Sequence, residues 1–268
     1  MPLNPKLDQP IAIGRTAEVY AWQEGQVLKV FRDWVSINTI NHELRISRLV
    51  QATGLPVPAV LGDVVEVDGR RGICYERVEG VSMLVLIASH PLTMAKNMRL
   101  LGKLHAEMHS RQETALPSQR QILQEKIRTA EPLPDDLKQA ALQRLNKLPG
   151  GDRVCHGDFH PGNVLVTSKG PVVIDWIDSS SGNPLADVAR TLVLVSAASV
   201  PLNTFFGWYL KFFRKIFLSA YMHGYNQTSL FYQEQLKAWI PVVAAARLNE
   251  EISSENEHLL GIVRKGLT

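Results

Sequence analysis

The stretch HGDFHPGN, from His156 to Asn163, gathers two histidines, an aspartate and an asparagine around a Pro-Gly pair. Two kinds of chemistry use such side chains. Imidazole and carboxylate groups bind zinc or iron in metal-dependent hydrolases. Phosphoryl transfer instead uses a carboxylate at the accepting hydroxyl, together with oxygen ligands for a metal ion on the phosphates.

The hydrolase hypothesis places His156, Asp158 and His160 on one face of an extended strand, where side chains alternate. The Pro-Gly pair that follows breaks such a strand at once, and no further histidine follows at ligand spacing. The hypothesis also leaves Asn163 without a role. It is therefore the less favoured of the two.

For phosphoryl transfer, the spacing H-G-D-x-x-x-x-N matches the H-R-D-x-x-x-x-N catalytic loop of protein kinases, with Gly157 in place of arginine. In a tight loop, Asp158 faces the substrate hydroxyl and the side-chain oxygen of Asn163 reaches Mg²⁺, which prefers hard oxygen ligands. Downstream, the run VVIDWID places Asp175 at the end of an apolar stretch. A carboxylate there is expected to join metal and phosphates.

The cation that phosphoryl transfer needs is expected upstream, in the strand-like run QVLKVFR. Lys29 interrupts the apolar residues of this run, and a lysine there is costly unless it is paired. Glu43, in the helical stretch that follows, is the expected partner that holds Lys29 toward the phosphates. A lone lysine is more typical of a solvated edge strand, but the chain supplies the other groups in kinase order.

The elements that must position these residues fall into two groups. Short β-prone runs dominate the first part of the chain, at Ile11–Ile13, Ala17–Trp22, Val27–Phe31, Asp63–Val67 and Gly72–Val78. A helix capped by Asn38 is expected between the third and fourth of these runs. From Met94 onward helical periodicity prevails, apart from a β-like island around the HGDFHPGN motif.

This order predicts an α+β, protein-kinase-like fold with two lobes. Residues 1–78 are expected to form a small antiparallel five-stranded lobe with one helix, and residues 79–268 a larger, mainly helical lobe. The net charge of +3 includes no long basic run, so binding to nucleic acid or membrane is not expected. Two cysteines and the lack of an apolar leader segment predict a cytoplasmic protein.

The chain resembles the aminoglycoside phosphotransferase and choline kinase superfamily, the small-molecule branch of the protein-kinase-like fold. The resemblance covers residues 11–190 and rests mainly on HGDFHPGN followed by IDW, with weaker matches in IGRTAEVYAW and CYERVEGVS. It implies that ATP and Mg²⁺ are used to phosphorylate a hydroxyl of a small molecule, such as an aminoglycoside, an amino sugar or a choline-like metabolite.

The resemblance also implies individual roles. Asp158 is the expected catalytic base or aligner. The expected metal ligands are Asn163 and Asp175, and the expected phosphate clamp is Lys29 with Glu43. Further nucleotide contacts are expected from Gly14 and Thr16, and from the backbone of Glu76 and Val78 at the adenine edge. The loop after Ile13 departs from G-x-G-x-x-G, so only Gly14 offers an unrestricted backbone there.

Three residues are expected to support the catalytic loop. By the resemblance, His156 braces the loop, Asp187 in NPLADVAR ties it down through backbone hydrogen bonds, and His160 supports it or approaches the substrate. His105 and His109 lie four apart on an amphipathic stretch, but they lack the glutamate of H-E-x-x-H. We therefore expect them to pack or cap rather than to bind metal.

The acceptor is expected to be small. The stretch between Asp175 and Asp187 is short for an activation segment and no A-P-E follows, so an atypical protein kinase is the weaker alternative. Asp178, Glu250 and Glu251 are candidate acceptor contacts for a cationic group, although a solvated acidic helix face is the commoner origin of such a glutamate cluster.

Two alternatives and two questions stay open. The run Phe205–Phe217 is compatible with an interfacial membrane helix, but a core helix is the favoured interpretation. A nucleotide-binding module without catalysis is disfavoured because no expected catalytic side chain is missing. The sequence reveals neither the acceptor nor the oligomeric state.

Overall fold

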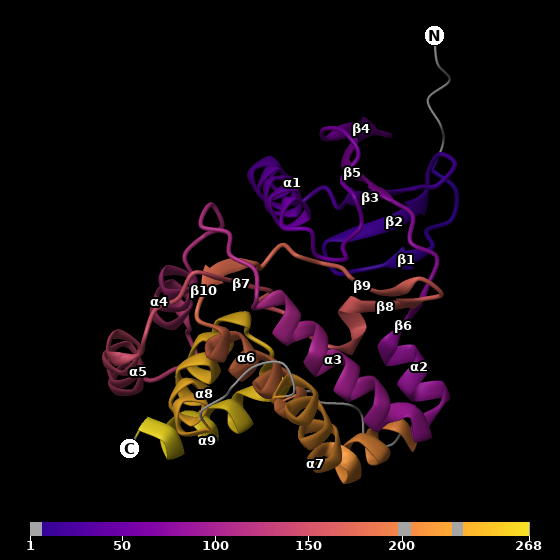
Figure 1. The fold of residues 1–268 in the computed structure, drawn as a ribbon. Coiled ribbons are helices and arrows are strands. Elements are labelled where there is room, and N and C mark those ends of the chain that lie inside the picture. The colour runs from indigo at the N-terminus through magenta and orange to yellow at the C-terminus, as the bar shows by residue number, and fades with distance from the viewer. Residues whose placement is uncertain (1–6, 198–204, 227–232, 268) are drawn as a thin grey trace. The chain divides into compact units, whose positions relative to one another are not determined.

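A computed structural model describes residues 7–197, 205–226 and 233–267, without the side chains of residues 205–213 and 233. The chain forms two compact units, Met1–Val81 with Leu165–Ile177 and Ser82–Val164 with Asp178–Thr268. Figure 1 labels the elements in chain order. The expectation for Phe205–Phe217 concerns side chains that lie mostly outside the described residues.

The first unit is built on a five-stranded antiparallel sheet, as the sequence predicts, and the strand order is β1-β2-β3-β5-β4. Its strands are β1 (Ala12–Ile13), β2 (Ala17–Ala21), β3 (Gln26–Phe31), β4 (Val65–Val67) and β5 (Arg70–Glu76). In this register Lys29 of β3 lies between Val19 of β2 and Ile73 of β5. Asp68 and Gly69 both adopt positive φ, which closes the tight turn between β4 and β5.

Helix α1 (Ile37–Ala52) packs on this sheet through Ile40 and Leu44, which join a buried cluster with Phe31 and Ile73. Its N-cap is Ser36, whose hydroxyl accepts the Thr39 N–H, so the expected cap at Asn38 is wrong. Both residue types make good caps, and the spacing of the apolar residues does not decide between them. Glu43 lies three residues after Ile40 and therefore shares the buried face.

A three-stranded sheet of order β6-β8-β9 leads the chain to Asp175. Its strands are β6 (Val81–Ser82), β8 (Val164–Thr167) and β9 (Gly170–Val173). The Val173 N–H donates to Pro56 O at 2.8 Å, which ties β9 to the loop after α1 within the first unit.

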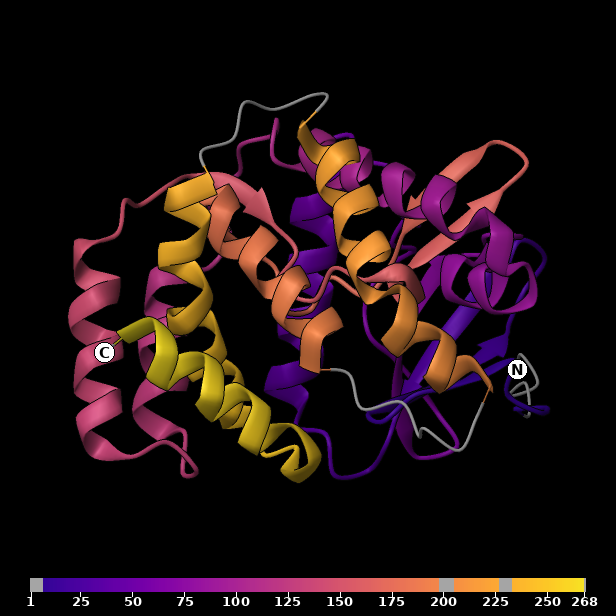
Figure 2. The ribbon, with the colours of Figure 1, turned by 90° about the horizontal axis from the view of Figure 1, so that it is seen from below.

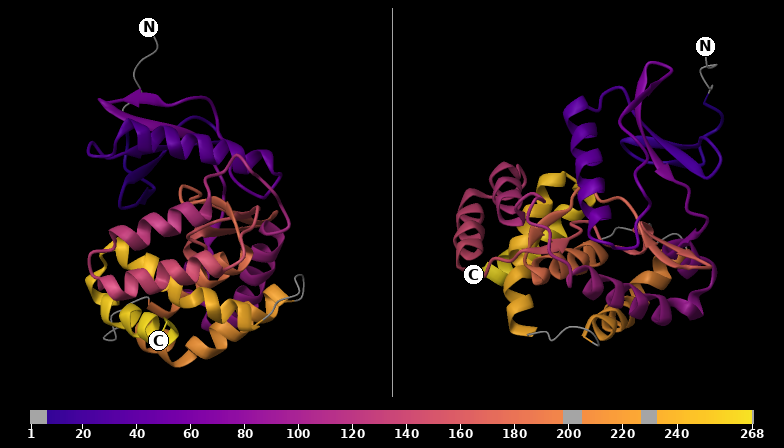
Figure 3. Two further views of the ribbon diagram at one scale, coloured as in Figure 1. Left: turned by 90° about the vertical axis from the view of Figure 1, so that its left-hand side faces the viewer. Right: turned by 45° about the horizontal axis from the view of Figure 1, so that its top comes forward.

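The second unit is mainly helical. Its helices are α2 (Met83–Ser89), α3 (Met94–Met108), α4 (Gln119–Thr129), α5 (Asp135–Lys147), α6 (Pro184–Ala197), α7 (Phe205–Asn226), α8 (Gln233–Arg247) and α9 (Ser253–Leu267), with 3₁₀ turns η1 (Pro91–Thr93), η2 (Pro161–Asn163) and η3 (Leu248–Glu250). α3 packs along α7 (Figure 2), and α4 and α5 pack against each other and against α8 (Figure 3). Within the described residues, every helix is too short or too polar to cross a lipid bilayer.

Two short strands bracket the HGDFHPGN segment in the second unit. β7 (Arg153–Cys155) and β10 (Ser180–Gly182) pair antiparallel, with Ser180 opposite Cys155. β10 was not predicted, because Ser-Ser-Gly has low β-propensity. The pairing holds both ends of the loop region that carries the motif.

Candidate functional site

The first unit brings Lys29, Glu43 and Asp175 together. Lys29 Nζ lies 2.6 Å from Glu43 Oε1 and 3.4 Å from Asp175 Oδ1. Burial would lower the pKa of the Lys29 amine, but the two carboxylates raise it above its ordinary value. Lys29 is therefore a paired cation that keeps its charge at physiological pH.

Glu43 is buried and is held by the fold through one oxygen. Its Oε1 atom accepts from Lys29 and from the Tyr75 hydroxyl at 3.2 Å. Its Oε2 atom is buried without a hydrogen-bond partner among the described residues. Buried polar atoms are usually satisfied, so this oxygen marks a place where the fold leaves a polar group unmatched.

Asp175 follows β9 in the left-handed region, with φ of 64°, which is uncommon for a residue other than glycine. The neighbouring Trp176 is buried, and its indole N–H donates to Val173 O at 3.0 Å. His42 Nε2 lies 3.3 Å from Ile177 O. These contacts fix the segment while the Asp175 side chain stays 46% exposed.

The loop between β1 and β2 contains Gly14 and Thr16. Arg32 organises it, because its side chain donates to the carbonyls of Gly14 and Arg15 and its backbone N–H donates to Thr16 O. The Gly14 N–H donates to Ala17 O at 2.8 Å. In the described part of the chain the N–H groups of Arg15 and Thr16 have no such partner, and such groups can bind an anion.

Glu76 ends β5 and Val78 lies just beyond it. The Glu76 N–H donates to Ala59 O at 2.8 Å, and the Arg77 N–H donates to Gly25 O at 2.9 Å. The backbone N–H of Glu76 is therefore already used within the first unit. Val78 has left the sheet, so its N–H is not part of the strand ladder.

In the second unit, the segment after β7 is a tight loop and not a strand. Gly157 has φ of 80°, and a Cβ there would clash with the Asp178 carbonyl oxygen, so glycine is required on both counts. His156 is buried, and its Nδ1 accepts the Asp158 N–H at 3.2 Å. The extended strand that the hydrolase hypothesis requires is absent, and in the described residues His156, Asp158 and His160 form no metal-ligand group.

Asn163 closes this loop onto Asp158. Its Nδ2 atom donates to the Asp158 carbonyl at 2.9 Å and to Asp158 Oδ2 at 3.3 Å. The Asn163 amide donor is thus used internally, and Oδ1 is the one atom of this side chain with lone pairs that a cation can use. His160 Nδ1 accepts the Gly162 N–H at 3.0 Å, and His160 Nε2 lies 3.5 Å from Asp158 Oδ2.

The Asp158 carboxylate is ionised at physiological pH. Burial would raise its pKa, but the hydrogen bond and charge of His160, followed by the charges of Arg190 and His156, lower the pKa well below its usual range. Arg190 Nη2 lies 4.0 Å from Asp158 Oδ1. Asp158 is therefore an ionised hydrogen-bond acceptor and a weak base.

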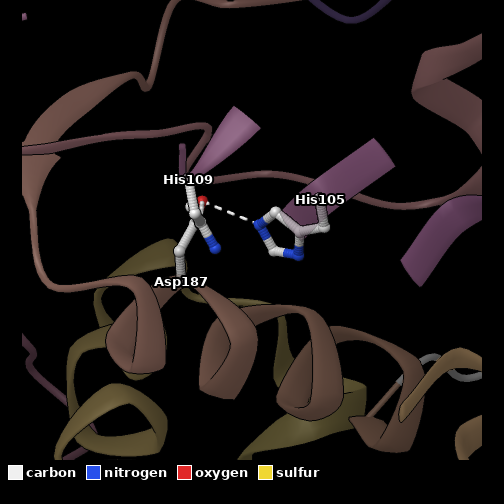
Figure 4. Close-up of side chains that lie close together, drawn as sticks. All are labelled: His105, His109 and Asp187. Atoms are coloured by element: carbon white, nitrogen blue, oxygen red, sulfur yellow. Dashed lines mark hydrogen bonds and ion pairs between the residues drawn. The ribbon is translucent and has the colours of Figure 1, made fainter. Parts of the chain in front are cut away.

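Asp187, in the first turn of α6, anchors the start of the loop. Its Oδ2 accepts the His156 N–H at 2.6 Å and its Oδ1 accepts the Gly157 N–H at 2.9 Å. The same carboxylate contacts His105 of α3 and His109, the C-cap of α3 (Figure 4). The sequence analysis assigned these histidines to packing or capping, and His109 does cap α3. It gave no signal of the contact with Asp187, because α3 and α6 are far apart in the chain.

Arg190 is a second residue that the sequence analysis missed. Its Nε donates to Gly157 O at 2.9 Å, and its Nη2 pairs with Glu250. The signal was present in DVAR, because a three-residue spacing puts Asp187 and Arg190 on one helix face.

The three candidate acceptor residues differ in their surroundings. A recess in the second unit is lined by Lys126, Gly157, Asp178 and Arg190, among others. Asp178 is 46% exposed there, with Lys126 Nζ 3.6 Å away. Glu250 instead pairs with Arg190 and, at 2.6 Å, with Arg247. Glu251 is exposed in a left-handed conformation.

The model of the phosphotransferase enzyme family matches residues 8–239. A comparison with curated proteins finds no match.

Solved structures show the same kinase-like α+β fold. One is a choline/ethanolamine kinase family protein from Mesorhizobium loti, at 16% identity and a TM-score of 0.60 over 98% of this chain and 86% of that one. A thermostable mutant of aminoglycoside phosphotransferase APH(4)-Ia, in a ternary complex with ADP and hygromycin B, gives 15% identity and 0.65 over 97% and 94%. Amicoumacin kinase hAmiN, in complex with AMP-PNP, Ca²⁺ and Ami, gives 16% identity and 0.59 over 96% and 87%.

Proposed function

The chain belongs to the phosphotransferase enzyme family, and from this premise we propose that it transfers the γ-phosphate of ATP, with Mg²⁺, to a hydroxyl of a small polar molecule. The observation that carries the proposal is the cluster of Lys29, Glu43 and Asp175. β3, α1 and the segment after β9 each contribute one charged group to it. A charged lysine between two carboxylates, one of them half exposed, suits a polyanionic nucleotide with its metal ion.

We assign the Mg²⁺ ion to the two side chains that the sequence analysis names as its ligands. Asp175 offers an exposed carboxylate and Asn163 offers Oδ1, and both are hard oxygen ligands. When bound, the ion would neutralise charge that develops on the transferred phosphate. We assign Gly14 and Thr16 to the phosphates, and the backbone of Glu76 and Val78 to the adenine.

Asp158 is proposed as the residue that orients the acceptor. Its low pKa makes it a better hydrogen-bond acceptor for the substrate hydroxyl than a proton abstractor. In a loose transition state the bond from the γ-phosphorus to ADP is largely broken before the acceptor oxygen bonds to phosphorus. The hydroxyl therefore becomes acidic late, and its proton passes to Asp158 as the new P–O bond forms. His156, His160 and Asp187 hold Asp158 in place.

The acceptor is proposed to bind in the recess that Gly157 and Asp178 line. Asp178 is its most accessible carboxylate, whereas two guanidinium groups already match the charge of Glu250. A cationic group on the acceptor would therefore meet Asp178 first, with Glu250 and Glu251 further contacts. The structural relatives whose complexes contain hygromycin B or Ami support a small acceptor. We propose the cytoplasm as the compartment, because ATP is available there and Cys74 and Cys155 are free thiols.

The test begins with thermal shifts on Mg²⁺-nucleotides and continues with a screen of amino sugars, amines and small alcohols for acceptor-dependent ADP release. We expect stabilisation by Mg²⁺-ATP and release of ADP with at least one hydroxylated acceptor. Transfer of the γ-phosphate of labelled ATP to protein would identify a protein kinase instead. Stoichiometric zinc or iron without nucleotide stabilisation would support the hydrolase hypothesis.

A further inference from the structure

Two parallel chains of hydrogen bonds converge on Asp187. In one, His105 Nδ1 lies 2.6 Å from the Tyr221 hydroxyl and His105 Nε2 lies 3.0 Å from Asp187 Oδ2. In the other, His109 Nδ1 lies 2.8 Å from the Tyr225 hydroxyl and His109 Nε2 lies 3.3 Å from the same Asp187 oxygen. All five side chains are buried (Figure 4 shows the histidines and the aspartate).

The arrangement follows from helix spacing and close packing. His105 of α3 and His109, the C-cap of α3, are four residues apart, and Tyr221 and Tyr225 are four residues apart on α7, so each pair shares a helix face. The two helices approach closely because Gly102 of α3 has no Cβ, and an added one would clash with the backbone of Tyr221 and Tyr225. The duplicated pairing is therefore built into the contact between α3 and α7.

The donors and acceptors of this network match. A carboxylate that faces both Nε2 atoms requires a hydrogen on each, so each neutral ring presents Nδ1 as an acceptor for a tyrosine hydroxyl. Burial lowers the pKa of His105 to about 4, and burial raises the pKa of Tyr221, so both groups hold these neutral forms at physiological pH. The Asp187 carboxylate then accepts four hydrogen bonds, two from imidazoles and two from the backbone of His156 and Gly157.

We propose that His105, His109, Tyr221 and Tyr225 are positioning residues, which orient the Asp187 carboxylate so that it fixes the backbone leading into Asp158. The inference rests on the proposed function, in which Asp158 orients the acceptor hydroxyl. It assigns to α3 and α7 a role in turnover, although none of the four side chains touches Asp158 in the described residues. Removing a tyrosine hydroxyl should loosen one imidazole, then the carboxylate, then the loop.

The same three ligand atoms could in principle converge on a metal ion. Hydrogen bonding accounts for every one of them without an ion, and Asp187 Oδ2 is already the acceptor for the His156 N–H at 2.6 Å. The network interpretation therefore predicts a metal-free site.

The test compares Tyr221→Phe, Tyr225→Phe and the double variant with the wild type. Tyr20→Phe is the control, because it removes the hydroxyl of a buried tyrosine that is paired with Glu18 on β2 of the other unit. Each hydroxyl of the network should contribute about 10-fold to kcat, the usual effect of one hydrogen bond, while KM for ATP changes by less than about twofold. The double variant should lose more than either single variant, and Tyr20→Phe should keep wild-type kcat.

A second measurement does not depend on turnover. Hydrogen exchange at the His156 and Gly157 amides should accelerate in the two network variants and not in Tyr20→Phe. If the wild type transfers no phosphate, the proposed function fails, and exchange still tests the positioning role. Unchanged exchange and unchanged kcat in the double variant would overturn the inference, and so would a stoichiometric metal ion that is lost in His105→Gln.

Discussion

Two buried acidic groups of this molecule, Glu43 in the first unit and Asp187 in the second, show opposite treatments of charge. Glu43 holds Lys29 through one oxygen, its other oxygen has no partner among the described residues, and the nearby Asp175 is half exposed. Asp187 is closed from solvent and accepts four hydrogen bonds. A carboxylate whose oxygens lack protein partners can interact with a ligand, whereas a carboxylate whose oxygens all accept hydrogen bonds from the protein has a structural role.

The largest effect is expected at Asp158, a partly buried residue of the loop that Asp187 anchors. Asp158→Asn should lower kcat by about 10²–10⁴, the usual contribution of a positioned acid–base group, with ATP affinity and Tm little changed. Asp63→Asn is the matched control, because Asp63 is an 85% exposed surface carboxylate. Steady-state kinetics with titration of Mg²⁺-ATP check both. A collapse of ATP affinity would show that Asp158 has another role.

Asp187→Asn tests the buried hydrogen-bond network of the second unit. The amide nitrogen would face N–H donors where the wild type has an acceptor, so the free energy of unfolding should fall by about 3–5 kcal/mol, as for other broken buried networks. Denaturant unfolding of the variant and the wild type measures this difference. A loss below about 1 kcal/mol would mean that the network is not a scaffold.

Acidification should destabilise the same hydrogen-bond network around Asp187. The folded-state pKa of His105, about 4, lies below its ordinary value of 6.5, so the unfolded chain binds the proton first as pH falls. The stability that this histidine contributes is therefore complete above pH 6.5 and is lost as pH falls toward 4, by an amount on the order of 3 kcal/mol. Denaturant unfolding across this range should show a shallower pH dependence in His105→Gln, which keeps a donor but does not titrate. Identical slopes would contradict the neutral buried form.

Asp175→Asn makes the same chemical change at the half-exposed carboxylate of the first unit. Here the free energy of unfolding should be unaffected. Asparagine tolerates the left-handed conformation of this residue, and the side chain is half exposed. Loss of a metal-ligand charge should weaken Mg²⁺-ATP binding by about 10–100-fold, which calorimetric titration measures. The comparison between the regions fails if Asp175→Asn unfolds the protein and Asp187→Asn does not.

Much of the fold could be predicted because local patterns determine it. The five short strands of the first sheet and the helix that carries Glu43 follow from alternation, turn residues and apolar spacing. Family membership was predictable from HGDFHPGN and IDW, and the family match confirms it. The cap at Ser36 and the strand β10 were missed, since their determinants are a choice between equal caps and a pairing partner distant in sequence.

The site was predictable as a set of residue types but not as a set of contacts. The pairing of Lys29 with Glu43 followed from the cost of an unpaired lysine in an apolar strand. The use of Asp187 by two histidines did not, because packing of α3 against α7 and α6 creates it. Likewise, Glu250 pairs with Lys126, Arg190 and Arg247, which come from three different helices. The acidic residues next to Glu250 in the sequence therefore gave no sign of these ion pairs.

The most direct measurement follows γ-labelled ATP in the presence of Mg²⁺ and a panel of hydroxylated small molecules, with wild type and Asp158→Asn side by side. The account predicts that the wild type moves label into a small-molecule product and that Asp158→Asn binds ATP but forms almost none. Label that stays in ATP with every acceptor, or that appears only as free phosphate or on protein, would contradict it.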